Sequence, residues 1–426
     1  MAIECGAKNL YKAYGVPSLD LTFADKKSLV DRISGNNLIT FTRASTATYV
    51  GFDGLIKTAA VNEPRFDHNP TTGESLGLLV EEARTNLLLR SEEVDTTWTL
   101  TGLLAFGSGS TVDAIASPNG QITADLLTES TTTGAHQIAQ GINVTTGAVY
   151  TLSVFAKAAS SPRRLTLLVN NTNFGSTPSA VFDLSAGTNI SVGSGTATIT
   201  PFINGWYRVT LTTIAATGTG PNALSFRLTD NTNATSYTGD GTSGIYLWGA
   251  QLESGSFPTS YIPTTTAGVT RAADVASITG AAFSSWYRQD EGTMFIDGVL
   301  RGILTQNYFV SISAGFSGAD AHVIFGVSGA LRYAVAVSSA SQVNIALGSA
   351  SVDDQQFIAA SYQQNNFAAA RNGVLGASDT LGNLPTVDTL KIGTNFSNGA
   401  VFSGHIRRFT YWPTRLSNST LQALTQ

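Results

Sequence analysis

Adjacent acidic residues are the groups in this chain that come nearest to catalytic chemistry. Glycoside hydrolysis uses two carboxylates that converge on one sugar bond, and the chain offers Glu81, Glu82, Glu92, Glu93, Asp353 and Asp354. Neighbouring residues of a β-strand point to opposite faces, so an adjacent pair does not by itself converge on a substrate. The sequence also lacks the long repetitive β-helix pattern of a depolymerase. A protein without catalytic residues is therefore the prediction, and a glycan-cleaving enzyme of the tailspike type is the alternative.

Other catalytic and metal-binding patterns are missing from the sequence. The histidines have no His-x-x-x-His spacing, and no nucleophile elbow, P-loop or dinucleotide fingerprint occurs. Calcium could bind through loop carboxylates, for which the candidates are Asp230, Asp240, Glu253, Asp320 and Asp353. Because no Asp-x-Asp loop supports these residues, the sequence predicts no metal and no cofactor, with a structural calcium ion left open as the alternative.

Two polar loops, each with one aromatic side chain, are the predicted saccharide-binding sites. Sugar faces stack on aromatic rings while amide and carboxylate groups bind the hydroxyls. The candidate residues of these loops are Asn171, Asn173, Phe174, Asp230, Asn231, Asn233 and Tyr237. A plain cluster of turn residues is the alternative for both loops. Trp206 and Trp248 lie within strand patterns and are expected in a core.

Short strands are the elements that would position these loops. Residues 149–155 alternate between polar and apolar, which is typical of a strand with one buried face. Similar patterns, including 164–169, 179–183, 196–201 and 206–213, recur with Gly, Asn, Ser and Thr between them. Asn372-Gly373 predicts a type I′ hairpin turn, and Ser417 predicts the cap of a short terminal helix.

These patterns predict an all-β protein with two antiparallel, jelly-roll-like β-sandwiches behind an N-terminal region. The expected boundaries are an N-terminal region at 1–90, a first sandwich at 91–265, a connector at 266–290 and a second sandwich at 291–426. Thr270-Arg271-Ala272 in the connector echoes Thr42-Arg43-Ala44, an echo too short to establish a repeat.

The composition of the chain excludes several classes of binding partner. Only 12% of residues are charged and the net charge is −5, so no basic stripe is available for nucleic acid. The single cysteine, Cys5, excludes a disulfide scaffold and is interpreted as incidental. No run approaches the roughly 20 apolar residues of a membrane span, and the first residues do not resemble a signal peptide. We expect a protein made in a host cytoplasm that does not insert into membranes.

Several motifs resemble those of phage proteins. Phe41-Thr-Arg-Ala-Ser-Thr-Ala-Thr-Tyr-Val50, with Asp53-Gly54-Leu55, and Gly77-Leu-Leu-Val-Glu-Glu-Ala-Arg-Thr-Asn-Leu87 resemble motifs of phage head-fibre and tail-fibre proteins. The first sandwich resembles the jelly-roll carbohydrate-binding modules that follow such motifs, through Trp206-Tyr-Arg-Val209 and 245–263. Residues 291–426 resemble a concanavalin- or laminin-G-type sandwich, through their Asn-Gly hairpin and closing strand at 404–412.

The resemblance implies a virion-surface appendage, a head or tail fibre or decoration protein, docked through residues 1–90 on capsid, portal or tail proteins. It implies that Arg43, Tyr49, Asp53, Glu81 and Arg84 form the virion-attachment interface, with pairing inside the domain as the alternative. A homo-oligomer, a trimer first, and adhesion to host-surface glycan are further expectations. Pure capsid-stabilising decoration without a ligand is the alternative to adhesion.

Overall fold

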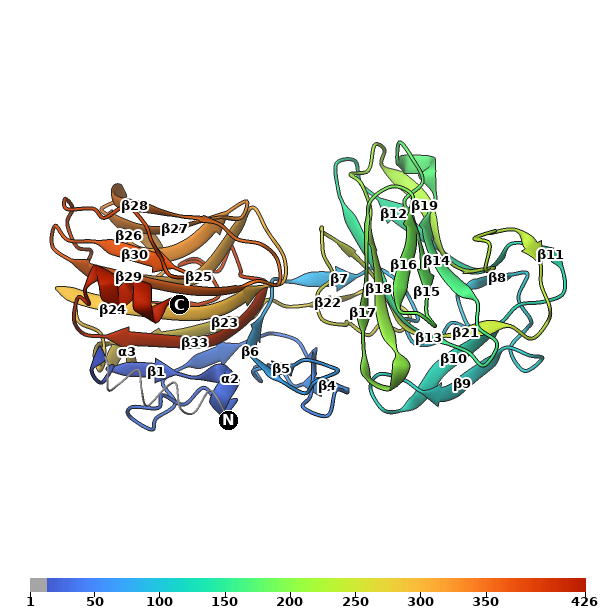
Figure 1. Cartoon of the computed structure of the whole chain (residues 1–426), viewed down its shortest axis with the longest axis horizontal. Coiled ribbons are helices and arrows are strands. Elements are labelled where there is room, and N and C mark those ends of the chain that lie inside the picture. Colours follow the sequence, from blue (N-terminus) through green and yellow to red (C-terminus); the bar gives the residue numbers. More distant parts are fainter. Residues whose placement is uncertain (1–13) are drawn as a thin grey trace.

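The computed structural model describes residues 14–426, so Cys5 lies outside the described residues. The chain forms two β-sandwich lobes joined by a narrow waist (Figure 1). All strand pairs within the sheets are antiparallel, which confirms the predicted all-β class with two sandwiches. Within the described residues no helix is both long and apolar enough to cross a membrane.

The first sandwich consists of two six-stranded sheets around an apolar core. One sheet has the order β17 (Thr196–Pro201), β18 (Tyr207–Thr212), β13 (Tyr150–Ala158), β21 (Gly244–Ser254), β10 (Ile122–Thr128) and β9 (Thr111–Ala116). The other has the order β16 (Thr188–Val192), β15 (Ser179–Asp183), β14 (Arg164–Val169), β19 (Gly220–Thr229), β12 (His136–Val144) and β8 (Thr99–Thr101). Alternate residues of these strands, such as Leu152 and Val154 of β13, are buried between the sheets.

The second sandwich is built from both ends of the chain. One sheet has the order β31 (Val374–Leu375), β30 (Ala368–Arg371), β29 (Gln355–Gln363), β24 (Glu291–Leu300), β33 (Gly404–Trp412), β6 (Ser75–Val80) and β5 (Phe66–His68), with β1 (Leu19–Leu21) also paired to β33. The other has the order β2 (Thr40–Thr42), β23 (Val275–Thr279), β32 (Thr389–Ile392), β25 (Gln306–Ala314), β26 (Ser317–Val327), β27 (Ala330–Val337) and β28 (Ala340–Ser349). Short helices accompany these sheets: α2 (Phe23–Lys26), α3 (Gly280–Ser284) and α4 (Asn418–Leu424).

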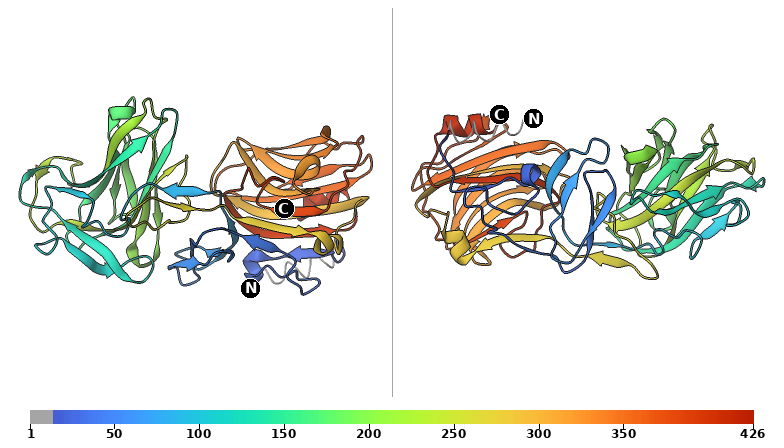
Figure 2. Two further views of the ribbon diagram at one scale, coloured as in Figure 1. Left: turned by 180° about the vertical axis from the view of Figure 1, so that it is seen from behind. Right: turned by 90° about the horizontal axis from the view of Figure 1, so that it is seen from below.

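The sheets divide the chain differently from the boundaries that the sequence suggested at 90 and 290. Strands from the N-terminal region and from the connector belong to the second sandwich, as Figure 2 also shows. The physical reason is burial: Leu19, Phe41, Leu78 and Ile278 lie in one core with Phe409. Strands this short do not bury an apolar face unless they join a larger sheet. The first sandwich is therefore an insertion into the second.

Candidate functional site

Two strands cross the waist between the lobes. β7 (Arg84–Asn86) pairs antiparallel with β22 (Val269–Arg271). The Asn86 amide donates to the carbonyls of Ala250 (3.0 Å) and Ile262 (2.9 Å), and its Oδ1 accepts from the amides of Leu88 and Leu252 (both 3.1 Å). Three of these four hydrogen bonds tie the fully buried Asn86 side chain to the first sandwich.

A β-hairpin from the N-terminal part of the chain contacts the first sandwich at one side of the waist. β3 (Ala47–Val50) and β4 (Ile56–Ala59) pair around the Asp53-Gly54 turn. Ile56 packs in an apolar cluster that includes Phe155 and Trp248 of the first sandwich, and its amide donates to Pro118 O at 2.9 Å. The hairpin comes from the N-terminal part of the chain, so this contact joins segments of both lobes.

Glycine is required in the turn of this hairpin. Gly54 has a φ of +76°, and a Cβ at this position would lie 2.5 Å from Pro70 O. The preference of Asp-Gly for tight turns therefore coincides with a close approach of two backbones.

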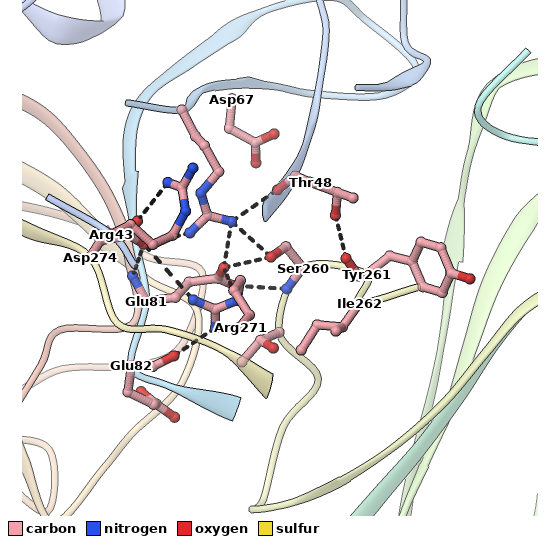
Figure 3. A network of polar contacts seen from close by, with 12 residues as sticks. Arg43, Thr48, Asp67, Glu81, Glu82, Ser260, Tyr261, Ile262, Arg271 and Asp274 are labelled. Atoms are coloured by element: carbon pink, nitrogen blue, oxygen red, sulfur yellow. Dashed lines mark hydrogen bonds and ion pairs between the residues drawn. The ribbon is translucent and has the colours of Figure 1, made fainter. Parts of the chain in front are cut away.

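A buried ionic network lies at the base of the hairpin (Figure 3). Asp274 pairs with two guanidinium groups, Arg43 Nη1 at 3.0 Å and Arg65 Nη2 at 2.5 Å. Arg65 Nη1 also lies 2.8 Å from Glu81 Oε2, and Arg271 Nε lies 3.5 Å from the same oxygen. Three guanidinium groups thus share two carboxylates, which leaves an excess of one positive charge inside the protein.

The first sandwich contributes to this network through the loop that leaves β21. The Ser260 amide and hydroxyl both donate to Glu81, each at 2.7 Å. Burial acts against the charged form of Glu81, but the Arg271 and Arg65 charges and the Ser260 donors outweigh it and hold the pKa of this carboxyl well below its usual range. Glu81 is therefore ionised at neutral pH and links the two lobes.

A cleft of about 710 Å³ opens between the lobes in front of this network. One wall is the outer face of β17 and β18, where register pairs align Thr196 with Thr212, Thr198 with Thr210 and Thr200 with Arg208. We call the threonines the hydroxyl face: Thr196, Thr198, Thr200, Thr210 and Thr212. Their neighbours in sequence, such as Val209 and Leu211, point the other way into the core.

The opposite wall of the cleft belongs to the second sandwich. Arg301 Nη1 pairs with Asp353 Oδ1 at 3.1 Å, and both side chains are about half exposed or more. His405 Nε2 lies 2.8 Å from Asp67 Oδ2, while Asp67 Oδ1 accepts from the Val50 amide at 2.6 Å. Neither carboxylate on this wall is therefore free of partners.

Arg208 is the cation of the first sandwich that lines the cleft. Its Nη2 donates to Ser153 Oγ at 3.1 Å, and its Cζ lies 5.5 Å from the centre of the Phe155 ring. Its Nε is buried and has no hydrogen-bond partner among residues 14–426. Burial lowers the pKa of Arg208, and the more distant Glu253 and Glu81 offset this only in part.

The predicted virion-attachment residues are divided by the structure between the interior and the surface. Arg43 and Glu81 are buried and paired within the chain, so they do not form an interface with another protein; this is the alternative that the sequence left open. Tyr49 is half-buried and lines the cleft. Asp53 pairs with Lys57 at 2.8 Å, and Arg84 pairs with Glu82 at 2.6 Å, so these two residues also have partners inside the chain.

The two predicted saccharide loops lie at opposite ends of the first sandwich. In the pairing of β14 with β19, Val169 leads into the first loop beside Leu224, whereas Arg164 lies beside Thr229 just before the second loop. The structure therefore does not bring the two loops together into one site.

Each loop is held by internal bonds. Phe174 is buried in the core and Asn173 donates to Pro221 O at 2.9 Å, while Asn171 is exposed. Asp230 accepts from Thr232 and Ala234 in a tight turn, and Asn231 and Asn233 both accept from Arg164.

Tyr237 belongs to a polar cluster beyond the second loop. Its hydroxyl donates to Glu129 at 2.6 Å, and Arg163 pairs with the same carboxylate at 2.6 Å and with Asp240 at 3.0 Å. The donors and acceptors of Tyr237 and Glu129 are thereby occupied within the chain.

Several of the carboxylates considered for catalysis are likewise engaged within the chain. Glu81 is buried, Glu82 is bound to Arg84, Glu92 accepts from Tyr261 at 3.0 Å and Asp353 is bound to Arg301. Among the described residues no group of three His, Cys, Asp or Glu side chains could hold a metal ion, so the calcium candidates do not gather into one site.

Sequence reasoning missed the hydroxyl face, although the pattern that produces it is visible. Residues 196–201 and 206–213 were predicted as strands, but the threonines at every second position were not interpreted as one shared face. A Thr-x-Thr-x-Thr pattern followed by another strand with the same alternation is the signal that could have found it. Arg208 could not have been singled out, because its side-chain contacts, Ser153 and Phe155, lie on β13, about 50 residues earlier in the chain.

No protein-family model matches this sequence, and no curated protein matches it. Among solved structures, the CBM40 of the Ruminococcus gnavus IT-sialidase, determined with α2,3-sialyllactose bound, is 17% identical over 33% of this chain and 84% of its own, with a TM-score of 0.29. The NanB sialidase of Streptococcus pneumoniae is 12% identical over 34% of this chain and 26% of its own, with a TM-score of 0.30.

A third similar structure is a toxin domain. The receptor-binding domain of botulinum neurotoxin mosaic serotype C/D is 13% identical over 36% of this chain and 39% of its own, with a TM-score of 0.29. Each likeness covers about a third of this chain, so the function of the whole chain is argued from its own residues.

Proposed function

We propose that this chain is a non-catalytic, saccharide-binding structural protein of a bacteriophage particle, and that the cleft between its sandwiches takes the saccharide. The observation that carries the binding part is the hydroxyl face opposite Arg301 and Asp353 across a cleft of about 710 Å³. Ligand pockets generally measure about 300–1,000 Å³, so the cleft has room for an oligosaccharide.

The chemistry of the walls suits a ligand rich in hydroxyl groups. Each threonine hydroxyl both donates and accepts, and Thr196, Thr198 and Thr200 are exposed on an edge strand. The half-buried Tyr49 offers an aromatic surface at the hairpin side of the same cleft. Because the cleft residues come from both sandwiches and from the hairpin, the fixed waist would hold the binding surface in one shape.

The virion part of the proposal rests on the resemblance of the segments at 41–55 and 77–87 to phage fibre motifs. We propose a surface location on the particle, contact with other virion proteins and a homo-oligomer, a trimer first. Docking would use exposed groups such as Phe52, which is 79% exposed at the hairpin tip, because Arg43 and Glu81 are buried and ion-paired within the chain. Immunogold labelling of purified particles with an antiserum against the intact chain tests this location, and unlabelled particles would contradict it.

A saccharide array probed with the intact, labelled chain tests the binding part. We expect retention on a restricted set of bacterial-surface oligosaccharides, with competition by the same free sugars at millimolar concentration. Absence of binding to every surface polysaccharide of the host would contradict adhesion and leave decoration without a ligand as the function.

A further inference from the structure

We propose that the cleft selects an acidic saccharide, whose anionic group pairs with Arg208 while its hydroxyl groups lie on the hydroxyl face. This inference rests on the proposed saccharide-binding function and specifies the chemical class of the ligand. It concerns a carboxylate or a sulfate carried by a sugar, since a guanidinium group binds both.

The side chain of Arg208 uses few of its donors within the protein. A guanidinium group has five N–H donors. Within residues 14–426 the side chain of Arg208 makes one hydrogen bond, to Ser153 Oγ. It has no ion pair there, although its Nε is enclosed by protein. Partial burial of a cation that has no ion pair is costly, so an anion that reached Arg208 would recover part of that cost.

The carboxylates near Arg208 are already engaged by other groups. Glu253 is fully buried, and the Gln251 amide (2.7 Å) and the Thr259 hydroxyl donate to it. Glu81 is held by Arg65 and by both donors of Ser260. Glu253 and Glu81 attract Arg208 over a longer range but make no hydrogen bond or ion pair with it, so the guanidinium donors of Arg208 are left for a ligand.

The charged groups around the cleft favour an anion near Arg208. The network behind the cleft has one more guanidinium group than carboxylates. Arg301 adds a second guanidinium group from the other lobe, balanced by Asp353. Asp67 would repel an anion, but it lies on the opposite wall and is bound by His405 and the Val50 amide. An anion is therefore favoured on the Arg208 side of the cleft.

The position of Arg208 in the sheet places it in line with the hydroxyl face. Arg208 is the register partner of Thr200 on β17, and Thr210 and Thr212 follow it on the same face of β18. A saccharide lying along these strands would place one substituent at Arg208 and successive hydroxyl groups at the threonines.

Matched sugars test the charge preference in the intact chain. Isothermal titration would compare tetragalacturonate with its methyl ester, glucuronate-containing oligosaccharides with their carboxyl-reduced forms, and sulfated with unsulfated N-acetyllactosamine. We expect the acidic member of at least one pair to bind about 10- to 100-fold more tightly, the range of a charge-assisted hydrogen bond. The preference should shrink as salt is raised.

Arg208→Gln should remove this preference and leave the weaker neutral binding in place, and Arg208→Lys should retain part of it. Arg227→Gln is the matched control, because Arg227 lies on β19 in the other sheet and binds Gln137 there. Circular dichroism would confirm that each variant is folded. Equal affinity for both members of every pair, or a preference that survives Arg208→Gln, would overturn the inference while leaving saccharide binding intact. Absence of binding to any sugar, acidic or neutral, would overturn the proposed function as well.

Discussion

Replacing Asp274 by asparagine is expected to lower the free energy of unfolding of the second sandwich by about 3–5 kcal/mol, the usual cost of breaking a buried ion pair from one side. Asp274 is fully buried and is the carboxylate that pairs with both Arg43 and Arg65. Its removal would leave three guanidinium groups against Glu81 alone. Urea unfolding followed by circular dichroism would measure the change.

Asp353→Asn is the matched control for that measurement. Asp353 also pairs with an arginine, but its side chain is 62% exposed, and exposed pairs contribute little to stability. The expected result is a large loss of stability for Asp274→Asn and a small change for Asp353→Asn. Equal unfolding midpoints for the two variants would show that the buried network does not stabilise the second sandwich.

Replacing Thr198 by tryptophan is expected to weaken saccharide binding by about 100-fold or more, equivalent to about 2.7 kcal/mol. Thr198 is exposed in the middle of β17, and its hydroxyl lies 2.6 Å from that of Thr210. An indole at this position would occupy the cleft and cover the hydroxyl face. The stability of the fold should change little, because the side chain faces solvent.

Thr188→Trp supplies the comparison for this variant. Thr188 is an exposed threonine on β16, the edge strand of the opposed sheet, and does not line the cleft. Titration of both variants with the best sugar of the array should show loss of binding for Thr198→Trp alone. Loss in both, or in neither, would remove the hydroxyl face from the binding site.

Local structure could be predicted from the sequence because it depends on short-range patterns. The strands at 164–169, 179–183 and 196–201 agree with β14, β15 and β17, since period-two alternation marks a half-buried strand. The Asn372-Gly373 turn has positive φ at both residues, and the Ser417 hydroxyl accepts from the Thr420 amide at the start of α4.

Long-range partners could not be predicted in this way. Arg43 and Asp274 are 231 residues apart, and Arg65 and Asp274 are 209 residues apart. The short echo between 42–44 and 270–272 has a structural counterpart, because Arg43 and Arg271 both lie beside Asp274. The sequence showed only the similarity, since the position of Asp274 depends on strands that join both ends of the chain. The cleft could not be predicted for the same reason, because its walls come from segments that are far apart in the sequence.

Photoaffinity labelling would locate the saccharide, which we propose binds between the two sandwiches. The best sugar of the array, carrying a diazirine group, would be irradiated with the intact chain, and the labelled peptides would be identified by mass spectrometry. If saccharide binds in the cleft, we expect labelling within 196–212, 256–261 and 301–303. Excess free sugar should suppress this labelling, and Thr198→Trp should abolish it. Labelling confined to the loops at 170–174 and 230–237, with the cleft peptides unlabelled, would contradict it.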